Sequence, residues 1–167
     1  MMAQSKRKTD LGHWEFYAEY FKPEDYFGFT YMITFLLTGE RYVGKKQFWR
    51  CNKAGTKRYG PSDWRTYTSS SEHVNALLAE YGMDAFSFEI LQLNCSKGCS
   101  SYVESNVLHK IDSLTIPHPF LKEQRLFINR QIGPIRWIPK NCECVKAVES
   151  TVRHIKHGIQ ELSEPNE

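Results

Sequence analysis

Two tyrosines on neighbouring predicted strands are the first candidates for chemistry. Tyr31 and Tyr42 stand in two β-like runs that flank a turn at Gly39, a residue able to adopt the positive φ of a tight hairpin. A tyrosine has a pKa of about 10 and acts as a general base only where cations stabilise the phenolate. Lys45 and Lys46 follow closely and are such cations. The simpler interpretation, in which both tyrosines only pack across the strands, stays open.

A block of positive charge follows the second strand. Between Arg41 and Arg65, eight of 25 residues are basic and only Asp63 is acidic, a net +7, whereas the whole chain carries +3. Aromatic residues alternate with these charges, and the two types together can contact phosphates and stack on bases. The block therefore predicts a nucleic-acid partner, and a solvated basic loop is the alternative. The candidate contacts are Gly44, Lys45, Lys46, Arg50, Lys53, Lys57, Arg58 and Arg65.

Five cysteines limit the other chemistry that the chain can perform. An odd count argues against a complete disulfide framework, and no secretory segment or membrane-length apolar run begins the chain. We therefore expect an intracellular, cytoplasmic protein with no membrane partner. Four of the cysteines, Cys95, Cys99, Cys142 and Cys144, could bind a structural zinc ion in an interaction protein. This hypothesis is less favoured, because no CxxC knuckle is present and buried free cysteines are common.

The hydrophobic spacing predicts the elements that position these residues. Trp14, Tyr17 and Phe21 share one helical face, which predicts a short aromatic helix before Pro23. Strands are expected over 28–37, 41–45 and 85–93, helices over about 72–81 and 99–113, and irregular chain over 46–66 and 114–141, with a short strand at 126–129. The order predicts an α+β fold, a small antiparallel or mixed three-stranded sheet flanked by helices. In the helix over 72–81, the expected buried stripe is Val74, Leu77, Leu78 and Tyr81.

The last segment has a heptad-like pattern. Apolar residues recur with spacing 3-4-3-4-3 at Val145, Val148, Val152, Ile155, Ile159 and Leu162. This seam predicts a helix over 145–162, which either lies along its own domain or forms a homodimer contact. The chain is accordingly expected to be a monomer or a homodimer.

In order and spacing, these features resemble the GIY-YIG nuclease family, in particular its small phage-type homing or Seg-like members. The residues that carry the resemblance are Gly28-Phe29-Thr30-Tyr31, Tyr42-Val43-Gly44, Trp64, Tyr67, Tyr81-Gly82, Glu89-Ile90-Leu91 and Glu104. The resemblance covers about 27–131 and implies a nuclease domain there. Residues 1–26 are then an N-terminal arm, and 132–167 are a C-terminal arm and helix for dimer or DNA contact.

The resemblance also implies an activity and roles for residues. The family hydrolyses phosphodiester bonds of double-stranded DNA with one divalent metal, Mg²⁺ or Mn²⁺, in each active site. Tyr31 and Tyr42 match its catalytic tyrosines, Glu104 matches its metal-binding glutamate, and Asn129 matches an asparagine that supports the site. The enzyme is then expected to be a homing or restriction endonuclease.

The family pattern is altered here in two places. The first half-motif, Gly28-Phe29-Thr30-Tyr31, has one extra residue between Gly and Tyr, or Phe29 in the place of the glycine. The second change concerns an arginine. The family usually carries an arginine on the helix after the second half-motif, followed four residues later by His or Tyr, and this pair is absent from the corresponding stretch. Arg50, Arg58 and Arg65 compete for the catalytic role of that arginine, Arg65 is favoured, and Lys46 is second. A catalytically inactive nucleic-acid-binding module on the same fold is the alternative function.

Overall fold

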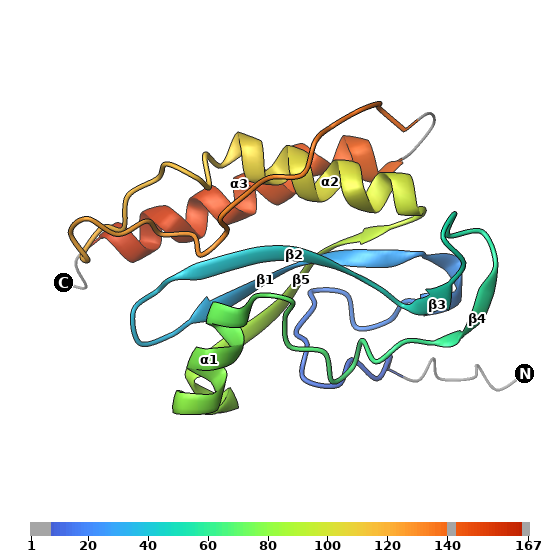
Figure 1. The fold of residues 1–167 in the computed structure, drawn as a ribbon, viewed down its shortest axis with the longest axis horizontal. Coiled ribbons are helices and arrows are strands. Elements are labelled where there is room, and N and C mark those ends of the chain that lie inside the picture. The colour runs from blue at the N-terminus through green and yellow to red at the C-terminus, as the bar shows by residue number, and fades with distance from the viewer. Residues whose placement is uncertain (1–7, 140–142, 165–167) are drawn as a thin grey trace, which may run out of the picture.

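The computed structural model describes residues 8–139 and 143–164. Its centre is an antiparallel three-stranded sheet in the order β2-β1-β5, formed by β1 (Gly28–Phe35), β2 (Arg41–Gln47) and β5 (Phe86–Asn94). Helices cover the sheet, so the predicted α+β fold is confirmed (Figure 1). The turn between β1 and β2 contains Gly39 with φ of 84°, the positive φ that a hairpin turn requires.

β1 is buried on both faces because it is the middle strand. Its side chains alternate between two cores, as the two-residue period of a strand requires. Met32 faces one core, and the other core contains Phe29, Tyr31, Ile33 and Phe35. Both sides of the hairpin are therefore held by packing, and β2 forms one edge of the sheet.

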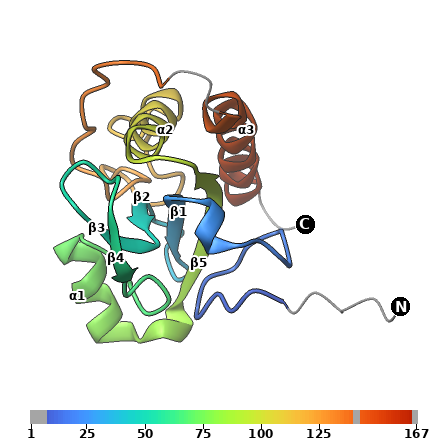
Figure 2. The same ribbon diagram turned by 90° about the vertical axis from the view of Figure 1, so that its right-hand side faces the viewer.

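Two helices form a layer on the Met32 face of the sheet. α2 (Lys97–Lys110) and α3 (Glu143–Ser163) lie side by side there (Figure 2). Val148, Val152 and Ile155 of the predicted seam are buried in this core, and the remaining seam residues pack against it. The seam therefore packs within its own chain and does not supply the apolar dimer contact that the heptad pattern left open.

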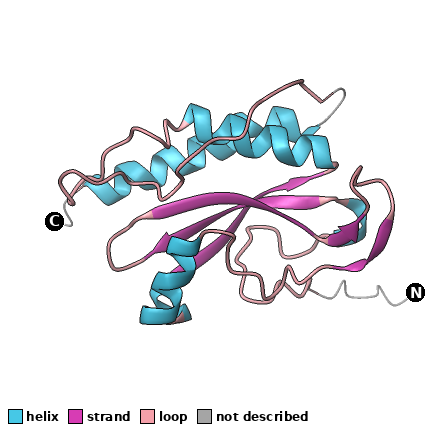
Figure 3. Cartoon of the chain, in the orientation of Figure 1, coloured by secondary structure: helices cyan, strands magenta, loops and turns pink. Residues whose placement is uncertain are grey.

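The opposite face is covered by α1 (Glu72–Tyr81) and by the N-terminal segment (Figure 3). Ser71 caps α1 by accepting a hydrogen bond from the Val74 amide, and Gly82 ends it with φ of 79°. Val74 is fully buried in α1, and Leu77 and Leu78 are partly buried. Tyr81 was wrongly assigned to the buried stripe, because it is 46% exposed and only one side of its ring packs, against Phe35.

The predicted N-terminal aromatic helix is wrong. Residues 11–22 are extended or irregular, and a short 3₁₀ turn, η1 (Pro23–Asp25), follows them. The backbone of Glu15 pairs with β5: its amide donates to the Phe88 carbonyl and its carbonyl accepts from the Ile90 amide, both at 2.8 Å. An edge strand offers free backbone groups, and this pairing outweighs the helical spacing of the aromatic residues.

Two stretches expected to be irregular make strand-like pairings. Within 46–66 the chain forms a small hairpin, β3 (Trp49–Cys51) and β4 (Arg58–Pro61), at one end of the sheet (Figure 1). Residues 126–128 run along the free edge of β2, where the Arg41 amide donates to the Leu126 carbonyl and the Ile128 amide donates to the Arg41 carbonyl. This pairing corresponds to the short strand predicted at 126–129.

One further short element, η2 (Met83–Ala85), joins α1 to β5. Among the helices of the described ranges, none is long and apolar enough to span a membrane.

Candidate active site

The strand register places Tyr31 directly opposite Gly44. The ring of Tyr31 lies over the Gly44 backbone so closely that a methyl group there would be 2.5 Å from the tyrosine hydroxyl oxygen. Only glycine leaves room for this approach. The hydroxyl of the first candidate tyrosine is thereby held against the edge strand, at the glycine of the second half-motif.

Tyr31 is almost fully enclosed, with 1% of its surface exposed. Its ring lies between Trp14, at a centroid distance of 5.0 Å, and Tyr42 and Tyr67, each at 6.2 Å. Burial, followed by the neighbouring Tyr67 and Tyr42, raises the pKa of Tyr31 well above its ordinary value, and the charge of Glu104 adds to this. Tyr31 is therefore a neutral phenol at physiological pH.

Tyr42 is the more accessible of the two tyrosines. Its hydroxyl lies 3.4 Å from the Ser70 hydroxyl, just before α1. Burial raises the pKa of Tyr42, the hydrogen bond with Ser70 lowers it, and the negative charge of Glu104 raises it further. The sequence suggested cations that would stabilise a phenolate, whereas the net effect of these surroundings favours the phenol.

Glu104 lies on α2 and forms an ion pair with Lys45 of β2, with 2.8 Å between Nζ and Oε2. Lys45 faces the α2 side of the sheet, and its ammonium group also donates to the Ser101 hydroxyl at 3.2 Å. Burial is the main cause of the raised pKa of both tyrosines, and the charge of Glu104 adds to it. Lys45, the partner of Glu104, lies on the same strand as Tyr42 and Gly44.

The Glu104 carboxylate fits the requirements of a magnesium ion. The glutamate side chain is 21% exposed, so it is reachable from solvent. In phosphate-processing sites Mg²⁺ is bound by one or two carboxylates together with water and substrate phosphate. One accessible carboxylate beside a basic surface is such a donor set, and Glu104 would hold the ion.

Lys46 and Arg65, the two candidates for the arginine position, have different surroundings. Lys46 Nζ lies 3.7 Å from the centroid of the Tyr67 ring and 2.6 Å from Asp63 Oδ1, and its hydrogen bond lowers the pKa of that carboxyl. Arg65 instead donates to the Asp10 carbonyl and pairs with the Asp10 carboxylate at 3.3 Å. The structure therefore brings Lys46 next to the tyrosine cluster and directs Arg65 toward the N-terminal segment.

Asn129 completes the outer edge of β2. Its side-chain oxygen accepts from the Val43 amide at 3.0 Å, and its side-chain nitrogen donates to the Val43 carbonyl at 2.8 Å. Asn129 is buried, and Val43 stands between Tyr42 and Gly44. A side-chain amide thus replaces the missing strand partner and holds the backbone that carries the tyrosine and the glycine.

The basic block only partly forms a continuous surface. Lys45, Lys46 and Arg50 line an open pocket of about 550 Å³ together with Lys97 of α2. Arg58 is exposed, but its guanidinium donates to the Glu24 and Tyr26 carbonyls. Lys53 and Lys57 are exposed on the β3–β4 hairpin, where the Lys57 ammonium lies 5.6 Å from the Tyr59 ring.

Three residues near the tyrosines had no role in the sequence-based interpretation. Tyr67 touches Tyr31, and its place three residues after Trp64 in the quoted pattern was the available signal. Arg130 and His73 line a second open pocket with Tyr42, of about 630 Å³. Arg130 directly follows Asn129, but nothing in its local sequence indicated the proximity to Tyr42.

Comparison with known families identifies the domain to which these residues belong. Residues 14–132 match the family model described as "Putative endonuclease segE, GIY-YIG domain". The chain belongs to this GIY-YIG family. The match includes Trp14 and extends through Asn129 and Arg130, so every residue of the strand-edge site lies inside the GIY-YIG domain. No curated protein and no solved structure gives a significant match.

Membership in the GIY-YIG family suggests a nuclease activity for the domain. The GIY-YIG family is a nuclease family, its model here describes an endonuclease domain, and such a domain implies a DNA substrate. Nucleases of the family generally use a divalent metal.

Proposed function

We propose that the chain is a metal-dependent endodeoxyribonuclease of the homing or restriction type that hydrolyses phosphodiester bonds in double-stranded DNA. One observation supports the proposal: β2 carries Gly44 opposite Tyr31 and also carries Lys45, which pairs with Glu104 and lines a basic pocket. A phosphodiester is an anion, and such an edge offers it cations, hydroxyl groups and a carboxylate for a metal.

The cations at the edge suit a DNA backbone. Lys45 and Lys46 lie on opposite faces of β2, as neighbouring strand residues do, and Arg130 lies beside Tyr42. The strand from Tyr42 to Gln47 measures about 17 Å at roughly 3.3 Å per residue. That length corresponds to about five phosphates of one DNA strand along the helix axis. We assign Lys46 and Arg130 to the phosphates next to the cleaved bond.

We assign the role of general base, which accepts the proton of the attacking water, to Tyr42. Tyr42 lines an open pocket, whereas Tyr31 is enclosed. Burial is the main cause of the raised pKa of Tyr42 and the Glu104 charge adds to it, so compensation of that charge would lower the pKa and favour the phenolate. A divalent metal held by Glu104 would supply this compensation and would stabilise the leaving oxygen. Tyr31 keeps its proton and positions Tyr42 and Tyr67 by contact.

A plasmid-cleavage assay with Mg²⁺ tests the proposal. The wild-type chain should convert supercoiled plasmid to nicked or linear DNA. Glu104→Gln should lower the rate by about 10²-fold or more, in the range typical of groups that act in the transition state. The matched control is Glu149→Gln on α3, because Glu149 also forms a partly exposed pair with a lysine, Lys110, away from the site. Equal cutting by Glu104→Gln and wild type would overturn the assignment.

A second pair of variants tests the assignment of Tyr42 as general base. Tyr42→Phe should lose about 10²–10⁴-fold in rate, the usual contribution of a positioned general base. Tyr81→Phe is the control, because Tyr81 is half-exposed on α1 and its ring contacts Phe35. If wild-type protein binds DNA with steep salt dependence but never cuts it, the inactive binding module replaces the nuclease proposal.

A further inference from the structure

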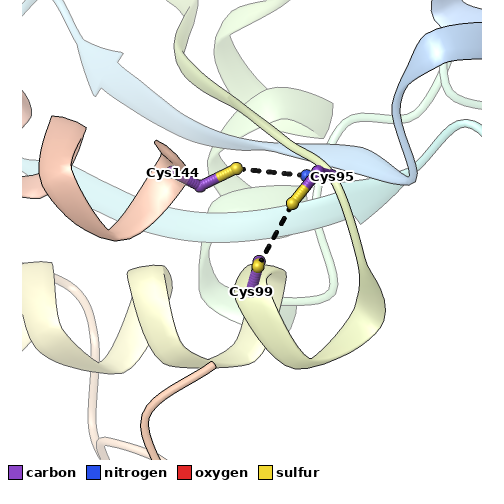
Figure 4. Close-up of side chains that lie close together, drawn as sticks. All are labelled: Cys95, Cys99 and Cys144. Atoms are coloured by element: carbon purple, nitrogen blue, oxygen red, sulfur yellow. Dashed lines mark hydrogen bonds between the residues drawn. The ribbon is translucent and has the colours of Figure 1, made fainter. Parts of the chain in front are cut away.

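Three cysteine sulfurs converge at a second site, between the end of β5 and the starts of two helices. Cys95, Cys99 and Cys144 point toward one another, with every pair of sulfurs within 4.8 Å (Figure 4). The Cys95 and Cys99 sulfurs are 3.3 Å apart. Cys142, the fourth member of the sequence-based zinc hypothesis, lies outside the described residues.

The surrounding backbone favours thiolates at this place. Cys99 lies in the first turn of α2, whose N-terminus is capped by Ser96, and a helix N-terminus stabilises negative charge. The Cys95 amide donates a hydrogen bond of 3.2 Å to the Cys144 sulfur. Hydrogen bonds of this kind support metal-bound sulfurs from the second coordination shell.

We propose that Cys95, Cys99 and Cys144 bind a zinc-class divalent cation that is separate from the nuclease metal. Zinc prefers thiolates in tetrahedral geometry at about 2.3 Å, which sets ligand sulfurs about 3.8 Å apart. The sulfurs here need only small side-chain adjustments to reach that spacing. The fourth ligand position is open to water or another donor.

The metal would bind the reduced cluster. The Cys99 sulfur is disulfide-bonded, so a thiol reductant must first act: two reductant thiols are oxidised to a disulfide, and Cys99 and its bonded sulfur are both released as thiols. Each cysteine releases its proton as its sulfur coordinates the cation.

The position of the cluster indicates what the cation would do. Cys95 and Cys99 belong to the nuclease domain, and Cys144 is the second residue of α3. A shared ion would fasten the start of α3 to the β5–α2 corner, where the Cys144 carbonyl already accepts from Gln92 at 2.6 Å. The site is structural, and its properties can be measured without DNA cleavage.

Cobalt titration of the reduced full-length chain tests the site. After reduction, chelation and removal of both reagents under inert gas, the wild type should bind one Co²⁺ per chain with thiolate-to-cobalt absorption, and Zn²⁺ should displace it. Cys95→Ser should weaken Co²⁺ binding by at least about tenfold, because even changes in the second coordination shell cause a loss of that size. It should also reduce the thiolate-to-cobalt absorption. Cys51→Ser is the matched control, because Cys51 lies on β3 and is not part of the cluster.

The exposed position of Cys95 keeps its variant informative, because serine there leaves no cavity in the core. Circular dichroism checks that it is folded. Absence of stoichiometric Co²⁺ binding by reduced wild type would overturn the proposal in favour of disulfide chemistry. Equal binding by wild type and Cys95→Ser would overturn it in favour of an adventitious ion.

Discussion

Replacing Gly44 with alanine places a methyl group against the ring of Tyr31. The new carbon would lie 2.5 Å from the tyrosine hydroxyl oxygen and 2.6 Å from Cζ, whereas ordinary contact begins at 3.4 Å. The overlap is therefore about 0.9 Å, the difference between these two distances. The ring has little room to retreat, because Trp14 and Tyr67 occupy its other sides.

The strain must be relieved by moving β2 outward or by distorting the tyrosine cluster. Insertion of an extra carbon into a packed core costs about 1–3 kcal/mol of unfolding free energy. For a chain of this size, each kcal/mol lowers the melting temperature by about 2–4 °C, so the expected drop is about 2–12 °C. Displacement of β2 also disturbs the two hydrogen bonds between Val43 and Asn129, which shifts the proposed catalytic Tyr42.

Thermal unfolding followed by circular dichroism measures the drop, and plasmid cleavage well below the transition measures the effect on the site. Gly98→Ala is the control, since its nearest contact would be an ordinary 3.7 Å and a helical alanine is favoured over glycine by up to about 1 kcal/mol. In a background of Tyr31→Ala the clash is gone, and Gly44→Ala should cost little more. An unchanged melting temperature for Gly44→Ala in the wild-type background would refute the argument.

Three further substitutions test the support of the site. Asn129→Ala leaves the Val43 amide and carbonyl without their partner and should lower the unfolding free energy by about 2–4 kcal/mol. Urea unfolding measures this loss, and a loss within error of zero would show that water replaces the side-chain amide. Burial raises the pKa of Tyr31 in the folded state. The contribution of the neutral tyrosine to the unfolding free energy is therefore fully present below a pH of about 10 and is lost as the pH rises further. Tyr31→Phe should therefore flatten the alkaline decline in unfolding free energy, and an unchanged slope between pH 9 and pH 11, roughly the window around the ordinary pKa, would contradict this. Trp14→Ala removes a buried ring and its 2.7 Å hydrogen bond to the Trp64 carbonyl, and should cost about 3–5 kcal/mol in the same urea assay, whereas Tyr17→Ala, at an 88% exposed residue, should cost little.

The failed prediction of an N-terminal helix has a clear physical origin. Spacing alone placed Trp14, Tyr17 and Phe21 on one helical face, yet Trp14 and Phe21 are buried while Tyr17 is 88% exposed. The aromatic residues find their cores from an extended chain, because the edge of β5 offers hydrogen-bond partners to Glu15. Such an edge exists only in the folded sheet, so the local pattern could not indicate it.

The heptad seam illustrates the same limit in another way. The spacing correctly predicted a helix and its apolar face, but it is equally compatible with a partner chain and with the chain's own sheet. In the structure the apolar face packs against the chain's own core. Arg41 of β2 also donates to the Gly158 and Ile155 carbonyls of α3. The occupant of an apolar face depends on which surface lies nearby, and that is a tertiary property.

By itself, the sequence determined the hairpin and the order of the family motifs, because these depend on short-range properties. The two-residue period of a strand and the turn at Gly39 predicted the two strands of the hairpin, whereas the register that sets Tyr31 opposite Gly44 came from the structure. Only the tertiary structure decided which distant side chains reach that strand edge. Asn129 binds Val43 across 86 residues of sequence, and Glu104 reaches Lys45 from another layer of the fold. Contacts of this separation depend on how the layers pack, and they leave no periodic trace in the chain.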